Sequence, residues 1–382
     1  MIGKDRNGHR ENRREFLQKL GAGAGAASLY SSLRGGSQDA PPYPNLAELG
    51  AAYAKQGKVA AAKVYRMMEW EFHNPPDATF EIDVEGAMRA THDAGAQGVL
   101  LYTQSCWGYA LYPTNVGVRQ PRLDYDLFGR ELGVAHEMAM PVTAYYCLQM
   151  NHQIVLKNPD WGWVNEKGEQ QKYRFNFTCL DSPYRQYVLG MMEEIFSKYT
   201  VEELFLDVFG IQFAFFQHSN WDPFCFCKHT EAAWDHDHPG DPYREGFKTR
   251  AGMEARYHWH QKRTLIDMLD EITAIVHRYQ PHTLISLNGG PESFPREIMD
   301  RVDFLYNEPV ATTSGISLGA IISRGWDRPN YQGGVFSQFG YADTYPGSIA
   351  RVQADSLIVQ NARTFFVGNA PVIGGLDGQG YS

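Results

Sequence analysis

The sequence predicts a (β/α)₈ barrel, and three observations support this prediction. Short apolar segments alternate with helix-like segments over most of the chain. Polar and acidic residues directly follow several apolar segments, as at the active-site end of barrel strands. No GxGxxG sequence follows the first apolar segment, which counts against the alternative, a doubly wound open sheet with a dinucleotide site.

The expected strands are apolar segments that end at a turn or a polar residue. They are residues 64–73, 98–103, 141–148, 201–210, 282–287, 302–306, 330–336 and 364–367. The fourth, VEELFLDVFG, is the segment around which the barrel is expected to be organised, because three large apolar residues precede Asp207. A buried carboxylate is costly unless it is paired or solvated, so this position favours a functional acid. A structural Asp that caps a loop is the alternative.

Helices are expected between these strands. They are residues 45–58, 83–96, 123–140, 182–199, 253–280, 294–300, 316–322 and 345–361, and Pro183 suits the first turn of its helix. Two longer insertions, 151–181 and 211–250, interrupt the alternation, with Gly168 at a turn tip in the first. No helix is expected after the last strand. Either the chain is part of a longer protein, or helix 45–58 closes the barrel seam.

The composition counts against a nucleic-acid-binding protein and against a membrane-spanning one. The 382 residues carry a formal net charge of −9 without a long Lys/Arg run, so no nucleic acid partner is expected. No apolar stretch is long enough for a membrane span. The 13% aromatic content suits both a large core and rings that stack on sugars.

The first segment predicts export. Arg13 and Arg14 precede Phe16, Leu17 and the Gly/Ala-rich stretch LGAGAGAASL, which resembles a bacterial twin-arginine signal. Residues 1–40 are therefore expected to be signal peptide and linker, and residues 45–382 the catalytic domain. The Tat export machinery would be a partner, and the destination periplasmic or extracellular. A disordered basic tail is the alternative.

Two acids are candidates for catalysis. Asp207 ends the fourth strand and Glu308 follows the sixth, so they are expected to face each other across the barrel mouth, the end formed by the C-termini of the strands. Such a pair suits glycoside hydrolysis, with Asp207 as nucleophile and Glu308 as acid/base. The alternative for Glu308 is a surface loop acid beside Pro309.

Other strand ends carry residues suited to sugar binding. They are Glu71, His73, Trp107, Gln149, Asn151, His152 and Asn288. Amide and imidazole groups can donate to and accept from sugar hydroxyls, and a Trp offers an apolar plane. Each alone could equally be structural; their shared position suggests a site.

The Cys/His-rich fourth loop is open to another interpretation. Cys225, Cys227 and His229 could hold a structural zinc, although the spacing is not that of a zinc finger. A strained disulfide or free thiols are the alternatives. Cys106, Cys147 and Cys179 are expected to be buried thiols, and no cofactor is expected. A catalytic metal is disfavoured because no HxH ends the first strand.

Several segments resemble a known group. They include NPDWGWVNEKGE, CLDSPY at residues 179–184, FLD at residues 205–207 and CFCKHTEAAW. Over residues 64–308 the chain resembles bacterial "hypothetical glycosyl hydrolase" domains, which are related to α-L-fucosidase barrels and often fused to a β-galactosidase-type trimerisation domain. The resemblance implies that Asp207 is the nucleophile, and it matches Glu308 only by position. No trimerisation domain is expected within these 382 residues, and an oligomer is possible.

The resulting hypothesis is an exported, retaining glycoside hydrolase that acts on an α-linked sugar such as L-fucose, or on a galactoside. Two alternatives remain. One is a carbohydrate-binding barrel without catalysis, and the other is a metal-dependent hydrolase that uses the Cys/His loop.

Overall fold

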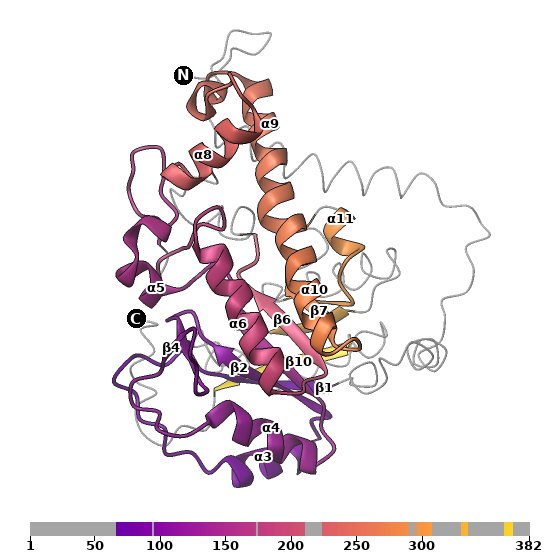
Figure 1. The fold of residues 1–382 in the computed structure, drawn as a ribbon. Coiled ribbons are helices and arrows are strands. Elements are labelled where there is room, and N and C mark those ends of the chain that lie inside the picture. Colours follow the sequence, from indigo (N-terminus) through magenta and orange to yellow (C-terminus); the bar gives the residue numbers. More distant parts are fainter. Residues whose placement is uncertain are drawn as a thin grey trace, which may run out of the picture.

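The computed structural model describes residues 66–93, 95–172, 175–210, 224–289, 294, 296–307, 330–334 and 363–369. At its centre lies a parallel sheet with helices packed around it (Figure 1). The central strands are β1 (Arg66–Glu71), β2 (Gly98–Gln104), β5 (Val142–Cys147), β6 (Glu203–Asp207), β7 (Leu284–Asn288), β8 (Phe304–Asn307), β9 (Asn330–Gly334) and β10 (Arg363–Asn369).

These strands form a closed ring. The order is β1-β10-β9-β8-β7-β6-β5-β2, and β2 also pairs with β1. Every neighbouring pair in the ring is parallel. The strand arrangement is therefore that of a (β/α)₈ barrel, as the sequence predicts. In such a ring the C-terminal strand ends all lie at one mouth, so residues that follow different strands can share a site.

The eight strands fall within or overlap the segments expected from the sequence. Most are shorter because the flanking residues leave the ladder. After β6, for example, Val208 has φ of 52° and Gly210 has φ of 78°, so the extended backbone ends at Asp207. The apolar run Leu204–Leu206 is buried, as expected for a central strand covered on both faces.

Most of the helices that the sequence predicted are shorter in the structure, whereas the helical segment expected at residues 253–280 begins three residues earlier, at Arg250. Those that correspond to the predicted helices are α3 (Val84–Asp93), α4 (Leu127–Glu137), α6 (Tyr184–Lys198), α9 (Arg250–Gln261), α10 (Met268–Tyr279) and α11 (Arg296–Met299). The expected helix 253–280 is α9 and α10, joined through the π-helical segment η4 (Lys262–Asp267). The expected helices 45–58, 316–322 and 345–361 lie outside the described residues, as does the export signal.

The loops after β2 and β5 contain elements that the sequence did not suggest. Two short strands, β3 (Tyr109–Ala110) and β4 (Val118–Arg119), pair with each other beside β2. The first expected insertion holds α5 (His152–Lys157) and the 3₁₀ segment η2 (Pro159–Trp161). Gly168 lies at a turn with φ of 81°, as expected.

The loop after β6 contains α8 (Lys228–Asp237) and the 3₁₀ segment η3 (Tyr243–Lys248). With the start of α9 they form an extension beyond one end of the barrel (Figure 1). The extension has an apolar cluster of its own, made by Phe224, Phe226, Trp234, Tyr243, Phe247, Met253 and Tyr257.

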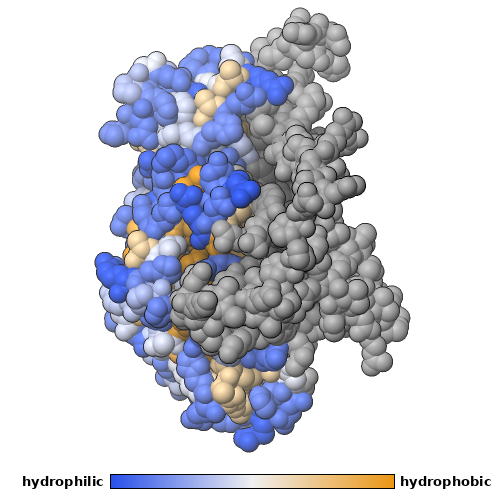
Figure 2. All heavy atoms as spheres, turned by 90° about the vertical axis from the view of Figure 1, so that its right-hand side faces the viewer, coloured by the Kyte–Doolittle hydropathy of each residue, from blue (hydrophilic) through white to orange (hydrophobic). Residues whose placement is uncertain are grey.

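The main core lies between the barrel strands and the surrounding helices. Over the described residues, the face in Figure 2 is largely hydrophilic, with apolar atoms reaching it mainly at mid-height. Within the described part of the chain, no helix has the length and apolar character needed to cross a membrane.

Candidate active site

Asp207 is the last residue of β6, at the barrel mouth, and a hydrogen bond holds its backbone in place. Its carbonyl accepts from the Leu148 amide at 2.8 Å, which ties the end of β6 to the end of β5. The next residue, Val208, has φ of 52°, a region that β-branched residues rarely adopt. Such local strain is often found at functional sites. The turn leaves the Asp207 side chain only partly buried at the end of an otherwise buried strand.

Three donors hold the Asp207 carboxylate. Asn288 Nδ2 donates to Oδ1 at 2.8 Å from the end of β7. The Val208 amide donates to the same oxygen at 2.7 Å. The Tyr145 hydroxyl, from β5, donates to Oδ2. The carboxylate oxygens accept all three bonds, and donors from both neighbouring strands fix the orientation of the side chain.

Glu71, the last residue of β1, and His73, two residues later, form a second polar pair at the barrel mouth. His73 Nε2 lies 3.0 Å from Glu71 Oε1, and the Glu71 side chain is buried. Burial lowers the pKa of His73, but the charges of Cys106 and Glu71 outweigh it and raise that pKa well above its ordinary value. The raised pKa favours the protonated form of the imidazole, which lies beside an acid and a thiol.

Two thiols connect this pair with Asp207. Cys106 Sγ lies 3.2 Å from Cys147 Sγ and 3.8 Å from the Tyr145 hydroxyl. Burial opposes ionisation of Cys106, but the hydrogen bond with Cys147 and the charge of His73 lower its pKa to about 6. Burial raises the pKa of Cys147 well above its ordinary value. Both thiols and a carboxylate oxygen of Asp207 lie within 4.8 Å of one another, so the site is continuous from β1 to β6.

Aromatic rings surround this network. Tyr102 stacks on Tyr145 with ring centroids 3.7 Å apart, and its hydroxyl donates to Glu69 at 2.6 Å. The His73 ring meets both tyrosine rings edge-on. These contacts leave little freedom for the groups beside Asp207 to move.

A second aromatic group lies beside His73. Trp107 Nε1 donates to the His73 carbonyl at 2.9 Å. The Trp107 ring lies edge-on to His152 and Phe175, with centroids 5.4 and 5.0 Å away. Burial and the nearby Lys172 lower the pKa of His152, which favours a neutral ring able to donate and accept.

Two of the expected binding residues support the backbone instead. Gln149 Oε1 accepts from the Gly210 amide at 2.8 Å, which braces the turn after Asp207. Asn151 Oδ1 caps α5 by accepting from the Ile154 amide at 3.0 Å. Both side chains are buried.

The structure thus groups most of the expected residues into contacting sets. Asn288 contacts Asp207, Glu71 contacts His73, and Trp107 contacts His73 and His152. Glu308 lies outside the described residues. Sequence reasoning missed Tyr102, Tyr145 and Phe175, and it treated Cys106 and Cys147 only as buried thiols. Tyr145 could have been found by alternation, because it lies two residues before Cys147 on the same face of β5.

The other cysteines form a separate buried cluster. Cys179, Cys225 and Cys227 place their sulfur atoms within 4.8 Å of one another. All five cysteines of the chain are buried free thiols, which for Cys106, Cys147 and Cys179 confirms the prediction. His229, expected beside Cys225 and Cys227, instead has Nε2 3.5 Å from Asp160.

Part of the chain is similar to a known protein family. Residues 83–208 match the family described as hypothetical glycosyl hydrolase 6. The match runs from the start of the helix after β1 to the residue that follows Asp207. None of the curated proteins compared with the chain matches it.

Several solved structures with a similar fold are glycoside hydrolases. α-L-Fucosidase isoenzyme 2 from Paenibacillus thiaminolyticus is 17% identical with a TM-score of 0.66, covering 83% of this chain and 48% of its own. The PgaB (BpsB) glycoside hydrolase domain from Bordetella bronchiseptica is 14% identical with a TM-score of 0.57, covering 79% and 92%. A β-galactosidase from the haloarchaeon Halorubrum lacusprofundi is 14% identical with a TM-score of 0.57, covering 80% and 52%. The chain thus spans about half the length of the fucosidase and the galactosidase.

Proposed function

We propose that this chain, whose residues 83–208 carry a glycosyl hydrolase family domain, is a retaining glycosidase with Asp207 as its nucleophile. The observation that carries the proposal is the setting of Asp207. It ends a central barrel strand, next to a strained residue, and donors from β5 and β7 orient its carboxylate. A carboxylate fixed in this way suits attack on an anomeric carbon.

The acid/base role remains assigned to Glu308, with Glu71 as the next acid to test. Glu71 lies at the same mouth, buried, with His73 3.0 Å away. The two assignments make different kinetic predictions. Loss of the true acid/base slows cleavage most for substrates with poor leaving groups, because these need protonation of the departing oxygen. Glu308→Gln and Glu71→Gln variants, compared on activated and unactivated glycosides, identify the residue.

For the substrate, we propose an α-linked terminal sugar such as L-fucose, with a galactoside as the second class to test. Support comes from the fold shared with a fucosidase and a galactosidase. Trp107 and His152 supply a ring and a neutral imidazole beside the acidic network. The twin arginine at Arg13 and Arg14 supports export through the Tat machinery.

Substitution of Asp207 tests the proposal. Asp207→Asn removes the attacking oxygen while the side chain keeps its size, so the protein should fold and kcat should fall by at least about 1,000-fold. Asp124→Asn, at an exposed acid two residues before the N-cap of α4, is the matched control and should keep full activity.

Addition of azide to an Asp207→Gly variant should restore turnover of an activated glycoside and give a glycosyl azide of inverted configuration. Normal turnover by Asp207→Asn would overturn the assignment. Sugar binding without hydrolysis by the wild-type protein, unaffected by Glu308→Gln, would favour the non-catalytic barrel instead.

A further inference from the structure

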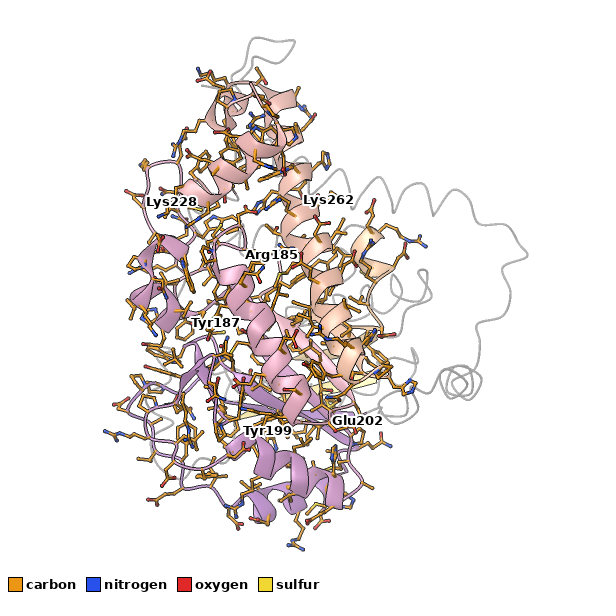
Figure 3. All side chains as sticks on the ribbon, viewed as in Figure 1. Arg185, Tyr187, Tyr199, Glu202, Lys228 and Lys262 are labelled. Carbon is orange, nitrogen blue, oxygen red and sulfur yellow. The ribbon has the colours of Figure 1, made fainter. Side chains whose placement is uncertain are left out.

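We propose that Cys179, Cys225 and Cys227 bind a structural zinc ion that fastens the extension formed by α8 and α9 to the barrel. The three residues come from two distant parts of the chain: Cys179 lies shortly before α6, and the other two lie directly before α8. In Figure 3 the labelled residues Arg185, on α6, and Lys228, the first residue of α8, mark these two elements. This inference is independent of the proposed glycosidase activity.

The geometry of the sulfur atoms carries the proposal. All three lie within 4.8 Å of one another, and Cys179 Sγ is 3.5 Å from Cys227 Sγ. All three side chains are buried. Thiolates at such separations fit around one tetrahedral zinc ion, which binds sulfur at about 2.3 Å. Soft sulfur ligands favour zinc over magnesium or calcium.

The surroundings of the cluster favour ionised sulfur. Cys227 is the N-cap of α8, and the Thr230 amide donates to its sulfur at 3.4 Å. The positive end of the helix and this amide both stabilise a thiolate. The Thr230 hydroxyl, 3.2 Å from Cys179 Sγ, also donates to Asp181 at 2.9 Å, as an outer group supporting the ligands would.

We assign the fourth ligand position to His260 on α9. Its side chain is 1% exposed, and neither ring nitrogen has a hydrogen-bond partner among the described residues. Nδ1 lies 3.7 Å from Asp181 Oδ2, the oxygen that receives the Thr230 hydroxyl. A buried imidazole without hydrogen bonds is costly, and a zinc bond would satisfy one nitrogen.

A metal here would add a direct link between the extension and the barrel, whereas α8 and α9 already pack together in the extension's own apolar cluster. The extension has its own apolar cluster, separate from the barrel core. Cys225 and Cys227, however, pack with the barrel core. Zinc bound to them, to Cys179 and to His260 would therefore link α6, α8 and α9. Structural zinc sites contribute directly to folding stability, so its removal should loosen the extension first.

The first test is elemental analysis of the full chain, purified without chelator. We expect about one zinc ion per chain, as in other structural sites. Cys225→Ser and Cys227→Ser should each lose most of it. Cys106→Ser and Cys147→Ser are matched controls, because they alter the other buried thiol pair and should keep the metal.

Wild-type protein provides a second test that does not depend on how the variants fold. Cobalt exchanged into the protein should show sulfur-to-metal charge-transfer absorption, and X-ray absorption at the zinc edge should show three sulfur ligands and one nitrogen. His260→Gln should replace the nitrogen with oxygen. A shell with no nitrogen in the wild-type protein would overturn the His260 assignment.

Two results would overturn the site itself. One is wild-type protein that carries no more zinc than Cys227→Ser after growth in zinc-supplemented medium. The other is a disulfide between Cys179 and Cys227 in peptide maps of the unreduced protein. A zinc site predicts that all five thiols react once the protein is denatured in chelator without reductant.

Discussion

The Asn288 side-chain amide donates to Asp207 Oδ1 at 2.8 Å, from the end of β7 to the end of β6. Neighbouring parallel strands bring these residues together, although 81 positions separate them in the chain. Together with Tyr145 from β5, the bond holds the carboxylate between its two neighbouring strands. The orientation of Asp207 is thus set by both neighbouring strands, together with the Val208 amide in the turn that follows.

Removal of the Tyr145 hydroxyl should impair catalysis without unfolding the barrel. Tyr145→Phe deletes the donor to Asp207 Oδ2 and keeps the ring that stacks on Tyr102. A hydrogen bond to a charged group contributes about 1.5–3 kcal/mol, so kcat/KM should fall roughly 10- to 100-fold. Tyr146→Phe is the matched control, because its side chain lies on the other face of β5. Equal losses in both variants would contradict a specific role for Tyr145.

The Cys106 thiol should titrate near pH 6 in the folded protein. The thiolate absorbance that disappears in Cys106→Ser should have a midpoint of about 6, against the ordinary value of 9.0. Because the folded-state pKa is lowered, the stability that this group contributes is fully present above 9.0 and is lost as the pH falls through about 6. His73→Ala removes the cation beside the thiol and should raise the midpoint. A midpoint near 9.0 in the wild-type protein would show that the two groups do not interact.

A buried acid on α4 should reduce stability as the pH rises. Glu131 is fully buried, and its carboxylate oxygens have no hydrogen-bond partner among the described residues. Burial, with the nearby Asp126, raises its pKa well above 4.5, so the unfolded chain releases this proton first and stability falls as the pH rises above 4.5.

Glu131→Met should therefore raise the free energy of unfolding at about pH 7 by roughly 1–4 kcal/mol and flatten its pH dependence, as measured by urea unfolding. Glu137→Met, at an exposed position of the same helix, should change it by less than about 0.5 kcal/mol. A destabilised Glu131→Met protein would indicate that the carboxyl group serves a structural role.

The stability of the extension should depend on one buried arginine. Arg256 is 1% exposed, with its guanidinium 4.1 Å from the centroid of the Trp234 ring and 2.8 Å from Asp241. Arg256→Met keeps the apolar stem but leaves these groups unpaired, at a cost of about 3–5 kcal/mol. Hydrogen exchange should accelerate over residues 224–261 more than in the barrel. Arg250→Met, whose ion pair with Glu254 is exposed, should have little effect.

The sequence predicted the strands well because each is a short apolar segment bounded by turn residues. It also placed Asp207, Asn288, Glu71 and His73 at strand ends, where the structure has them. The partners across strands could not be predicted, because they depend on register. Cys147, for example, lies beside Asp207 only through the pairing of β5 with β6.

The contacts among Cys179, Cys225 and Cys227 could not be predicted from the sequence either. Cys225 and Cys227 are close in sequence, which suggested His229 as their companion. The structure brings Cys179 to them instead, 48 residues before Cys227. Local spacing cannot reveal such a contact, because it arises when the loop after β6 folds back on the segment before α6.

Covalent trapping tests the central claim most directly. The full chain would be incubated with a fluorinated fucosyl or galactosyl fluoride, which forms a slowly hydrolysed glycosyl-enzyme in a retaining glycosidase. Digestion and mass spectrometry would then locate the sugar. We predict one sugar per chain, attached to Asp207. A sugar attached to another acid, or hydrolysis with inversion and no covalent intermediate, would contradict the assignment of Asp207 as the nucleophile.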